Sequence, residues 1–167
     1  MRKTAEQFYR KLIWAGDSLQ SLLLLAVRLY WGWQIAQTGW GKLGHLGKVT
    51  NFFTQLGVPA PGVNAVFIAV LEFVGGILIA AGFASRLFAL LLAGDMVVAF
   101  LAADRDALFS IFSDPSKLYA ATPYTFLFAF LIVFVFGPGK LSVDALLARK
   151  LRPWNRRNEA NVPRRAA

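Results

Sequence analysis

Four long apolar stretches limit the folds open to this chain more than any other feature. They cover approximately residues 18–38, 62–82, 86–103 and 119–136. A helix needs about 20 mainly apolar residues to cross the roughly 30 Å of hydrocarbon in a bilayer. Charged residues make up only 16% of the chain, against about 25% in soluble domains. The sequence therefore predicts an all-α integral membrane protein whose four spans pack as a four-helix bundle.

The segments outside these stretches divide the chain into three parts. We expect residues 1–17 to form a cytoplasmic amphipathic segment, residues 18–147 to form the four-span membrane domain, and residues 148–167 to form a basic, disordered cytoplasmic tail. Between the first two spans, apolar residues recur at helical spacing over residues 46–56. This pattern predicts a short amphipathic helix in the outer interface of the membrane.

The distribution of positive charge predicts the orientation. Of the 18 Lys and Arg residues, 13 lie on the side that would hold both termini, four lie on the opposite side, and Arg28 lies within the first span. Lys and Arg accumulate on the cytoplasmic side of membrane proteins. We therefore expect both termini in the cytoplasm, in the inner membrane of a bacterium. The basic tail then contacts anionic lipid, and no nucleic-acid partner is expected.

Three ionisable residues interrupt the spans. Arg28, Glu72 and Asp95 each lie nine or ten residues from the predicted cytoplasmic end of their span, which is roughly 14–15 Å at 1.5 Å per residue. A charge facing lipid costs about 2.5–3.5 kcal/mol on insertion scales. We therefore expect the three side chains to meet inside the bundle, with Trp31 one turn from Arg28 and able to stack on its guanidinium.

The charges of this predicted cluster do not balance. One cation faces two carboxyls, so we expect Glu72 and Asp95 to share one proton near neutral pH and to titrate as a coupled pair. Lys42 follows Arg28 by 14 residues, which places it about 21 Å farther out and beyond reach of the carboxyls. It is predicted to anchor the interface or to contact an anion at a pocket mouth. A purely structural role for the cluster stays open beside a functional one.

The residue types exclude several kinds of site. The chain has no cysteine and a single histidine, His45, so no metal or haem site of its own is expected. The segment "GWGKLG" follows no strand and is not interpreted as a dinucleotide-binding loop. Electrons in any redox reaction would have to come from a partner or from a bound organic cofactor.

Four motifs, in order along the chain, carry a family resemblance. They are "GWGK" after Arg28, "FFTQLGVPAP", "LEFVGGILIAAGFASR" and "FGPGKLSVDALL". Together they resemble the DoxX family of small four-helix bacterial membrane proteins over about residues 20 to 147. The resemblance implies functional positions at Arg28, Lys42 and Glu72, and it maps the closing Ser and Asp of the family onto Ser142 and Asp144.

The resemblance also implies a broad function. Some relatives are similar to the small membrane subunit of a thiosulfate:quinone oxidoreductase, and others are associated with membrane redox or oxidative-stress complexes. We therefore predict an accessory subunit, not a self-sufficient enzyme, that binds a quinone-like molecule and joins an oxidoreductase partner or a homo-oligomer. Glu72 or Asp95 would handle the proton. The alternatives are a proton-coupled transporter of a small solute and a structural or assembly protein.

Overall fold

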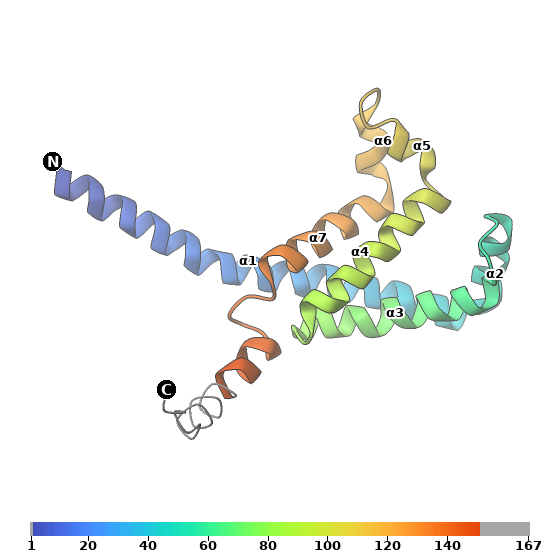
Figure 1. The fold of residues 1–167 in the computed structure, drawn as a ribbon, viewed down its shortest axis with the longest axis horizontal. Coiled ribbons are helices and arrows are strands. Elements are labelled where there is room, and N and C mark those ends of the chain that lie inside the picture. The colour runs from blue at the N-terminus through green and yellow to red at the C-terminus, as the bar shows by residue number, and fades with distance from the viewer. Residues whose placement is uncertain (1, 151–167) are drawn as a thin grey trace, which may run out of the picture.

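The computed structural model describes residues 2–150, a range that contains no β-strand (Figure 1). Its helices are α1 Arg2–Gly44, α2 Leu46–Gln55, α3 Pro61–Ala81, α4 Ser85–Ala102, α5 Arg105–Phe109, α6 Pro115–Ala120 and α7 Thr122–Phe136. A last helical segment covers residues 143–150. The predicted all-α class is confirmed. Within the described range α1, α3 and α4 are long and apolar enough to cross a membrane. Helix α7 has 15 residues, so the fourth span stays a prediction.

Helix α1 is longer than the predicted first span. It runs without a break over 43 residues and joins the predicted N-terminal segment to the span as one element. Its N-terminal part extends beyond the other helices (Figure 1). The first 17 residues contain no proline and one glycine, Gly16, and so provide no strong signal to end a helix. The tail beyond residue 150 lies outside the described residues.

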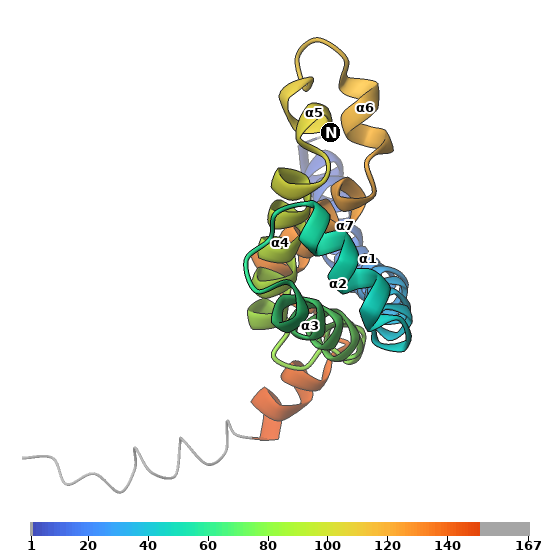
Figure 2. The ribbon, with the colours of Figure 1, turned by 90° about the vertical axis from the view of Figure 1, so that its right-hand side faces the viewer.

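The long helices form two antiparallel pairs. Helix α1 packs along α3, and α4 packs along α7. The pairs meet at the turn between α3 and α4 and diverge toward the opposite end, where α2, α5 and α6 lie (Figures 1 and 2). We call these the turn end and the α2 end. The hydrophobic core lies where the pairs meet, with Ile79, Leu92 and Phe130 among its fully buried side chains.

Small residues hold α1 against α3. Gly32 on α1 lies against Gly76 and Ala80 on α3, so closely that a Cβ on Gly32 would lie 2.9 Å from the Gly76 carbonyl oxygen. Gly39 lies against Ala69 in the same way, about two helical turns nearer the α2 end. Close backbone contact through small residues is typical of helix pairs in lipid. This seam fixes the register of α1 on α3, and the register decides which charged residues meet.

Helix α2 is the short helix predicted between the first two spans. It begins after His45 and ends at Gln55, within one residue of the predicted segment. It packs on α3 and lies across the α2 end of the fold (Figure 2). Pro61 then occupies the first turn of α3, where its missing N–H costs no helical hydrogen bond. The helix is confirmed, and its interfacial position stays a prediction.

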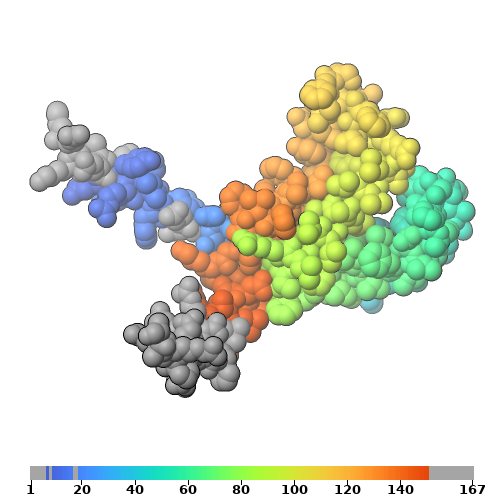
Figure 3. Space-filling model, viewed as in Figure 1, coloured from blue at the N-terminus to red at the C-terminus, as the bar shows by residue number. Residues whose placement is uncertain are grey.

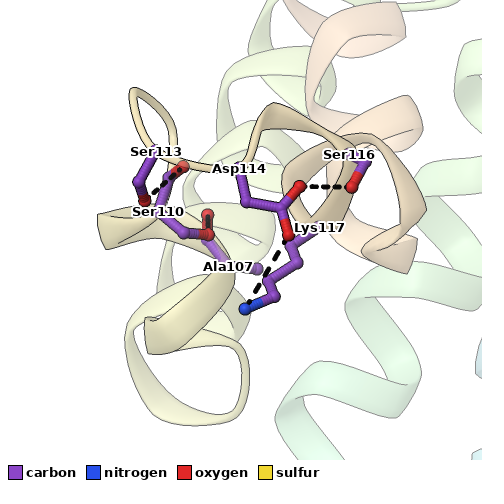
Figure 4. Close-up of polar contacts among 6 residues, drawn as sticks. All are labelled: Ala107, Ser110, Ser113, Asp114, Ser116 and Lys117. Carbon is purple, nitrogen blue, oxygen red and sulfur yellow. Dashed lines mark hydrogen bonds and ion pairs between the residues drawn. The ribbon is translucent and has the colours of Figure 1, made fainter.

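Two short helices, α5 and α6, lie in the connection between α4 and α7. Hydroxyl groups close the turn between them: Ser113 donates to the carbonyl of Ser110, and Ser116 donates to the Asp114 carboxylate (Figure 4). Lys117 Nζ lies 3.9 Å from the same carboxylate. Asp114 also stands immediately before α6, where a negative charge suits the helix dipole.

Candidate ligand-binding site

The structure divides the predicted cluster of buried charges between two places. The register of the α1–α3 seam sets Arg28 level with Gly82 at the turn end. Glu72 lies ten residues earlier on α3, about 15 Å away along the helix. The predicted meeting of Arg28 with Glu72 is therefore wrong. The sequence-based depths assumed that the first span begins at Ser18, whereas the described helix has no boundary there.

Arg28 belongs to a turn cluster, which we define as Arg28, Gly82, Leu141 and Asp144. Its guanidinium is fully buried, and Nη2 donates to the carbonyl oxygen of Leu141 at 2.5 Å. The Asp144 carboxylate acts on it electrostatically. Gly82 has φ +76°, and a Cβ there would collide with Arg28 Nη1. Arg28 thus joins α1 to the turn and to the C-terminal segment.

Asp144 completes this cluster by capping a different helix from its own. Its carboxylate accepts hydrogen bonds from the backbone N–H of Ala84 at 2.8 Å and of Ser85 at 3.1 Å. These N–H groups at the N-terminus of α4 have no acceptor within the helix, so the contact is an N-cap supplied from about 60 residues away. Ser142 accepts a hydrogen bond from the N–H of Ala145 at 3.1 Å and so caps the helical segment 143–150.

Lys42 and Glu72 form a partly buried ion pair nearer the α2 end. Lys42 Nζ lies 2.6 Å from Glu72 Oε1, and the Glu72 side chain is 2% exposed. The prediction that Lys42 cannot reach the carboxyls is wrong. Its 14-residue separation from Arg28 was measured correctly, but Glu72 lies at the depth of Lys42, not at the depth of Arg28.

Asp95 on α4 brings a second carboxyl to this ion pair. Glu72 and Asp95 interact with each other and with the Lys42 ammonium. Glu72 Oε2 and Asp95 Oδ2 are buried and have no hydrogen-bond partner among the described residues. We call Lys42, Glu72 and Asp95 the carboxyl cluster. The predicted pairing of Glu72 with Asp95 is found, with Lys42 in place of Arg28 as the cation.

The carboxyl cluster opens into a cavity of about 540 Å³ between α2, α3 and α4. Figure 3 shows the surface hollowed between the parts that contain α2 and α4. Most of the wall is apolar, and its residues come from α2 and the connection after it (Val49, Phe52, Phe53, Leu56, Val58, Pro59), from α3 (Ile68), and from α4 (Met96, Val98, Ala99, Ala102). A mostly apolar cavity of this size with a few convergent polar groups is typical of a small-molecule site.

The remaining predicted site residue, Trp31, does not line the cavity. It packs against the hydrophobic core and contacts Tyr30 edge to face, with ring centroids 4.8 Å apart. Lys48 and Asn64 line the cavity and were not predicted. Among the described residues no group of three or more His, Cys, Asp or Glu side chains is arranged to hold a metal ion.

Comparison with known proteins identifies a relative and a family. The chain is 31% identical over 133 residues to the inner membrane protein YqjF of Escherichia coli K12, and the match covers 79% of this chain and 97% of the relative. The DoxX family profile matches residues 23–105. The chain belongs to the DoxX family. No solved structure shows significant similarity to it.

Both clusters draw residues from the range that the DoxX family profile matches. The matched range includes Arg28, Lys42, Glu72 and Asp95. Leu141 and Asp144, which close the turn cluster, follow that range. Together with the apolar helices, the similarity to an inner membrane protein identifies this DoxX protein as a bacterial membrane protein embedded in the lipid bilayer.

Proposed function

We propose that this DoxX protein is an accessory subunit of a membrane redox system and that its cavity binds a small quinone-like molecule. One observation carries the proposal: an apolar cavity of about 540 Å³ ends on a partly buried cluster of one ammonium and two carboxyl groups. A structural ion pair would need no cavity beside it. Intramembrane charges that face a cavity mark ligand or proton pathways more often than packing contacts.

The apolar wall of the cavity favours a lipophilic ligand. Phe52, Phe53 and Met96 present aromatic and thioether surface to the cavity, which suits the flat face of a quinone-like ring. Val98 also lines the cavity and is 56% exposed on the outside of α4. That side of α4 would face lipid in the membrane. A lipophilic molecule can therefore reach the cavity from the bilayer without crossing water.

The carboxyl cluster supplies proton chemistry at the inner end of the cavity. A quinone-like molecule takes up or releases protons when its redox state changes. Glu72 and Asp95 share the charge of Lys42 and are placed to hold such a proton beside the ligand. In this proposal the electrons come from an oxidoreductase partner, and Arg28 serves only to close the turn end.

The experiment compares a substitution that fills the cavity with a matched one that does not. Ala99 lines the cavity, whereas Gly94 lies on the same helix in open space, where an added Cβ would meet no atom within 4 Å. Binding of a short-chain benzoquinone to the purified full-length protein is measured by calorimetry. We expect Ala99→Phe to abolish binding and Gly94→Phe to preserve it. Equal binding by both variants, or no binding by the unmodified protein, refutes the proposal.

A pair of further variants separates ligand binding from structure. Arg28→Leu should lower the yield of folded protein, because it removes the contact between α1 and the C-terminal segment. Glu72→Gln keeps the shape of the side chain and should give a folded protein with altered binding. Unfolding of Glu72→Gln to the same degree as Arg28→Leu would favour a purely structural role for both clusters.

A further inference from the structure

The connection between α4 and α7 exposes a group of large apolar side chains. We call residues 103–121 the α4–α7 connection. Phe109 is 77% exposed, Ile111 41% and Phe112 97%, and the three lie within four consecutive residues. None of the three belongs to the hydrophobic core or lines the cavity beside the carboxyl cluster. Large apolar side chains exposed together mark a surface that contacts a membrane or another protein.

The lengths of α4 and α7 place this connection at the boundary of the membrane. Helix α4 has 18 residues and α7 has 15, so the two helices are about 27 Å and 22 Å long. The hydrocarbon layer of a bilayer is about 30 Å thick. When the cytoplasmic ends of both helices lie at the inner boundary, as the predicted topology requires, neither helix reaches beyond the hydrocarbon. The connection then begins and ends at the depth of the outer lipids.

The path of the connection keeps it near that depth. Helices α5 and α6 turn aside from the direction of α4 and do not continue it (Figure 1). Helix α2, which lies at the same end of the molecule, also turns aside from the direction of α3 (Figure 1). A segment that leaves a spanning helix sideways follows the membrane surface, whereas one that continues the helix axis enters water. The α4–α7 connection is therefore placed to lie along the outer interface.

Charged side chains occupy a different part of the connection from the exposed apolar ones. They line a hollow whose other walls are alanines, and these charged residues are Asp104, Arg105, Asp106 and Lys117. None of the three exposed apolar residues lines this hollow. Separation of charged from large apolar residues is typical of an element that lies in the plane of the interface, with its apolar part among acyl chains and its charged part among headgroups.

Polar groups beside the apolar residues are paired within the connection itself. Ser110 Oγ donates to the carbonyl oxygen of Ala107 at 3.1 Å, and Ser113 Oγ donates to that of Ser110 at 3.3 Å (Figure 4). The backbone N–H of Asp114 also donates to the carbonyl oxygen of Ser110, at 2.8 Å. Polar groups that enter lipid must be satisfied internally, because no water is present to pair with them. These hydrogen bonds allow the neighbouring Phe112 to enter lipid without leaving the hydroxyl groups unpaired.

We propose that the α4–α7 connection lies in the outer interface of the membrane, with Phe109 and Phe112 inserted among lipid acyl chains. Its partner is therefore the lipid surface and not a protein in the water outside the membrane. The short spans favour lipid, because they do not carry the aromatic side chains far enough to reach bulk water. The inference goes beyond the proposed function and is independent of which ligand the cavity binds.

The experiment measures which solvent surrounds the exposed aromatic positions. Because the chain has no cysteine, Phe112→Cys and Phe109→Cys each carry a single spin label. The full-length variants are placed in liposomes of phosphatidylethanolamine and phosphatidylglycerol. Electron paramagnetic resonance then compares collisions of the label with oxygen, which concentrates in lipid, and with a water-soluble nickel chelate. We expect both labels to collide more with oxygen, at a depth of about 5–10 Å below the headgroup boundary.

The matched control lies on the charged part of the same connection. Lys117→Cys replaces a side chain that is 61% exposed and lines the hollow between the charged residues. We expect its label to collide more with the nickel chelate than with oxygen, which is the reverse of the result at position 112. All three substitutions remove exposed side chains, so none should prevent folding; circular dichroism checks this for each variant.

Two outcomes would overturn the proposal. If the labels at 109 and 112 collide with the nickel chelate as often as the label at 117, the aromatic positions lie in water and are available to a partner protein. If those two labels collide little with either reagent, protein covers them, as in contact with a second copy of this chain. Neither result bears on the cavity, so the proposed function is tested separately.

Discussion

The contact between α1 and α3 at Gly39 allows a direct test of the helix register. A Cβ at this position would lie 2.7 Å from the carbonyl oxygen of Ala69 and closer still to the backbone nitrogen of Phe73. Ordinary contacts between such atoms are about 3.5–4.0 Å. The obstructing atoms belong to the backbone of α3, so no side chain can rotate away. Gly39→Ala must push the two helices apart by about 1 Å, the difference between these distances.

Gly39→Ala should lower the free energy of unfolding, and Gly41→Ala is the matched control. Overpacking of this kind costs about 1–3 kcal/mol, because contacts along the seam lengthen together with the one that clashes. Gly41 lies two residues farther along the same helix, and a Cβ there would meet no atom within 4 Å. Gly41→Ala should therefore raise the free energy of unfolding by up to about 1 kcal/mol, since alanine is the better helix former.

The assay is reversible unfolding of both variants and the unmodified protein in mixed micelles of increasing SDS content, followed by circular dichroism. We expect the free energy of unfolding to fall for Gly39→Ala and to stay level or rise for Gly41→Ala. If both alanines stabilise the protein equally, α1 does not contact α3 through Gly39. The register that brings Lys42 to Glu72 would then be refuted with it.

Three further predictions concern the rest of the molecule. Asp144→Ala removes the cap of α4 and should lower the free energy of unfolding by about 0.5–2 kcal/mol. Asp144→Asn should retain only part of the cap, because its single amide oxygen can accept from the N–H of Ala84 or of Ser85 but not from both. An unchanged free energy of unfolding for Asp144→Ala would contradict the cap. For the orientation, the chain has no cysteine, so single cysteines report one position each. With both termini in the cytoplasm, Lys117→Cys should react with a membrane-impermeant thiol reagent in intact spheroplasts. Lys140→Cys should react only after permeabilisation. The reverse labelling pattern would show that the protein has the opposite orientation. Finally, Glu72 and Asp95 should hold one shared proton, so an infrared spectrum near neutral pH should show a carboxylic acid band that disappears when both are replaced by their amides. Absence of that band from the unmodified protein would contradict the shared proton.

The sequence was sufficient to predict features that depend on local chemistry. Apolar stretches of about 20 residues predicted the membrane-protein class and helices α3 and α4, because hydrocarbon requires every backbone N–H and C=O to be paired within the helix. The apolar spacing over residues 46–56 predicted α2. The cost of charge in lipid correctly indicated that Arg28 and Glu72 are buried in the protein, and Asp95 is partly buried.

Only the tertiary structure decided which of these charges meet. The distance between Arg28 and Lys42 along α1 follows from their sequence separation, but the register of α1 on α3 depends on how Gly32 and Gly39 fit the small residues of α3. That fit places Glu72 beside Lys42 and leaves Arg28 to the C-terminal segment. Backbone contact between two helices distant in sequence is a property of their paired surfaces, so neither helix encodes it alone.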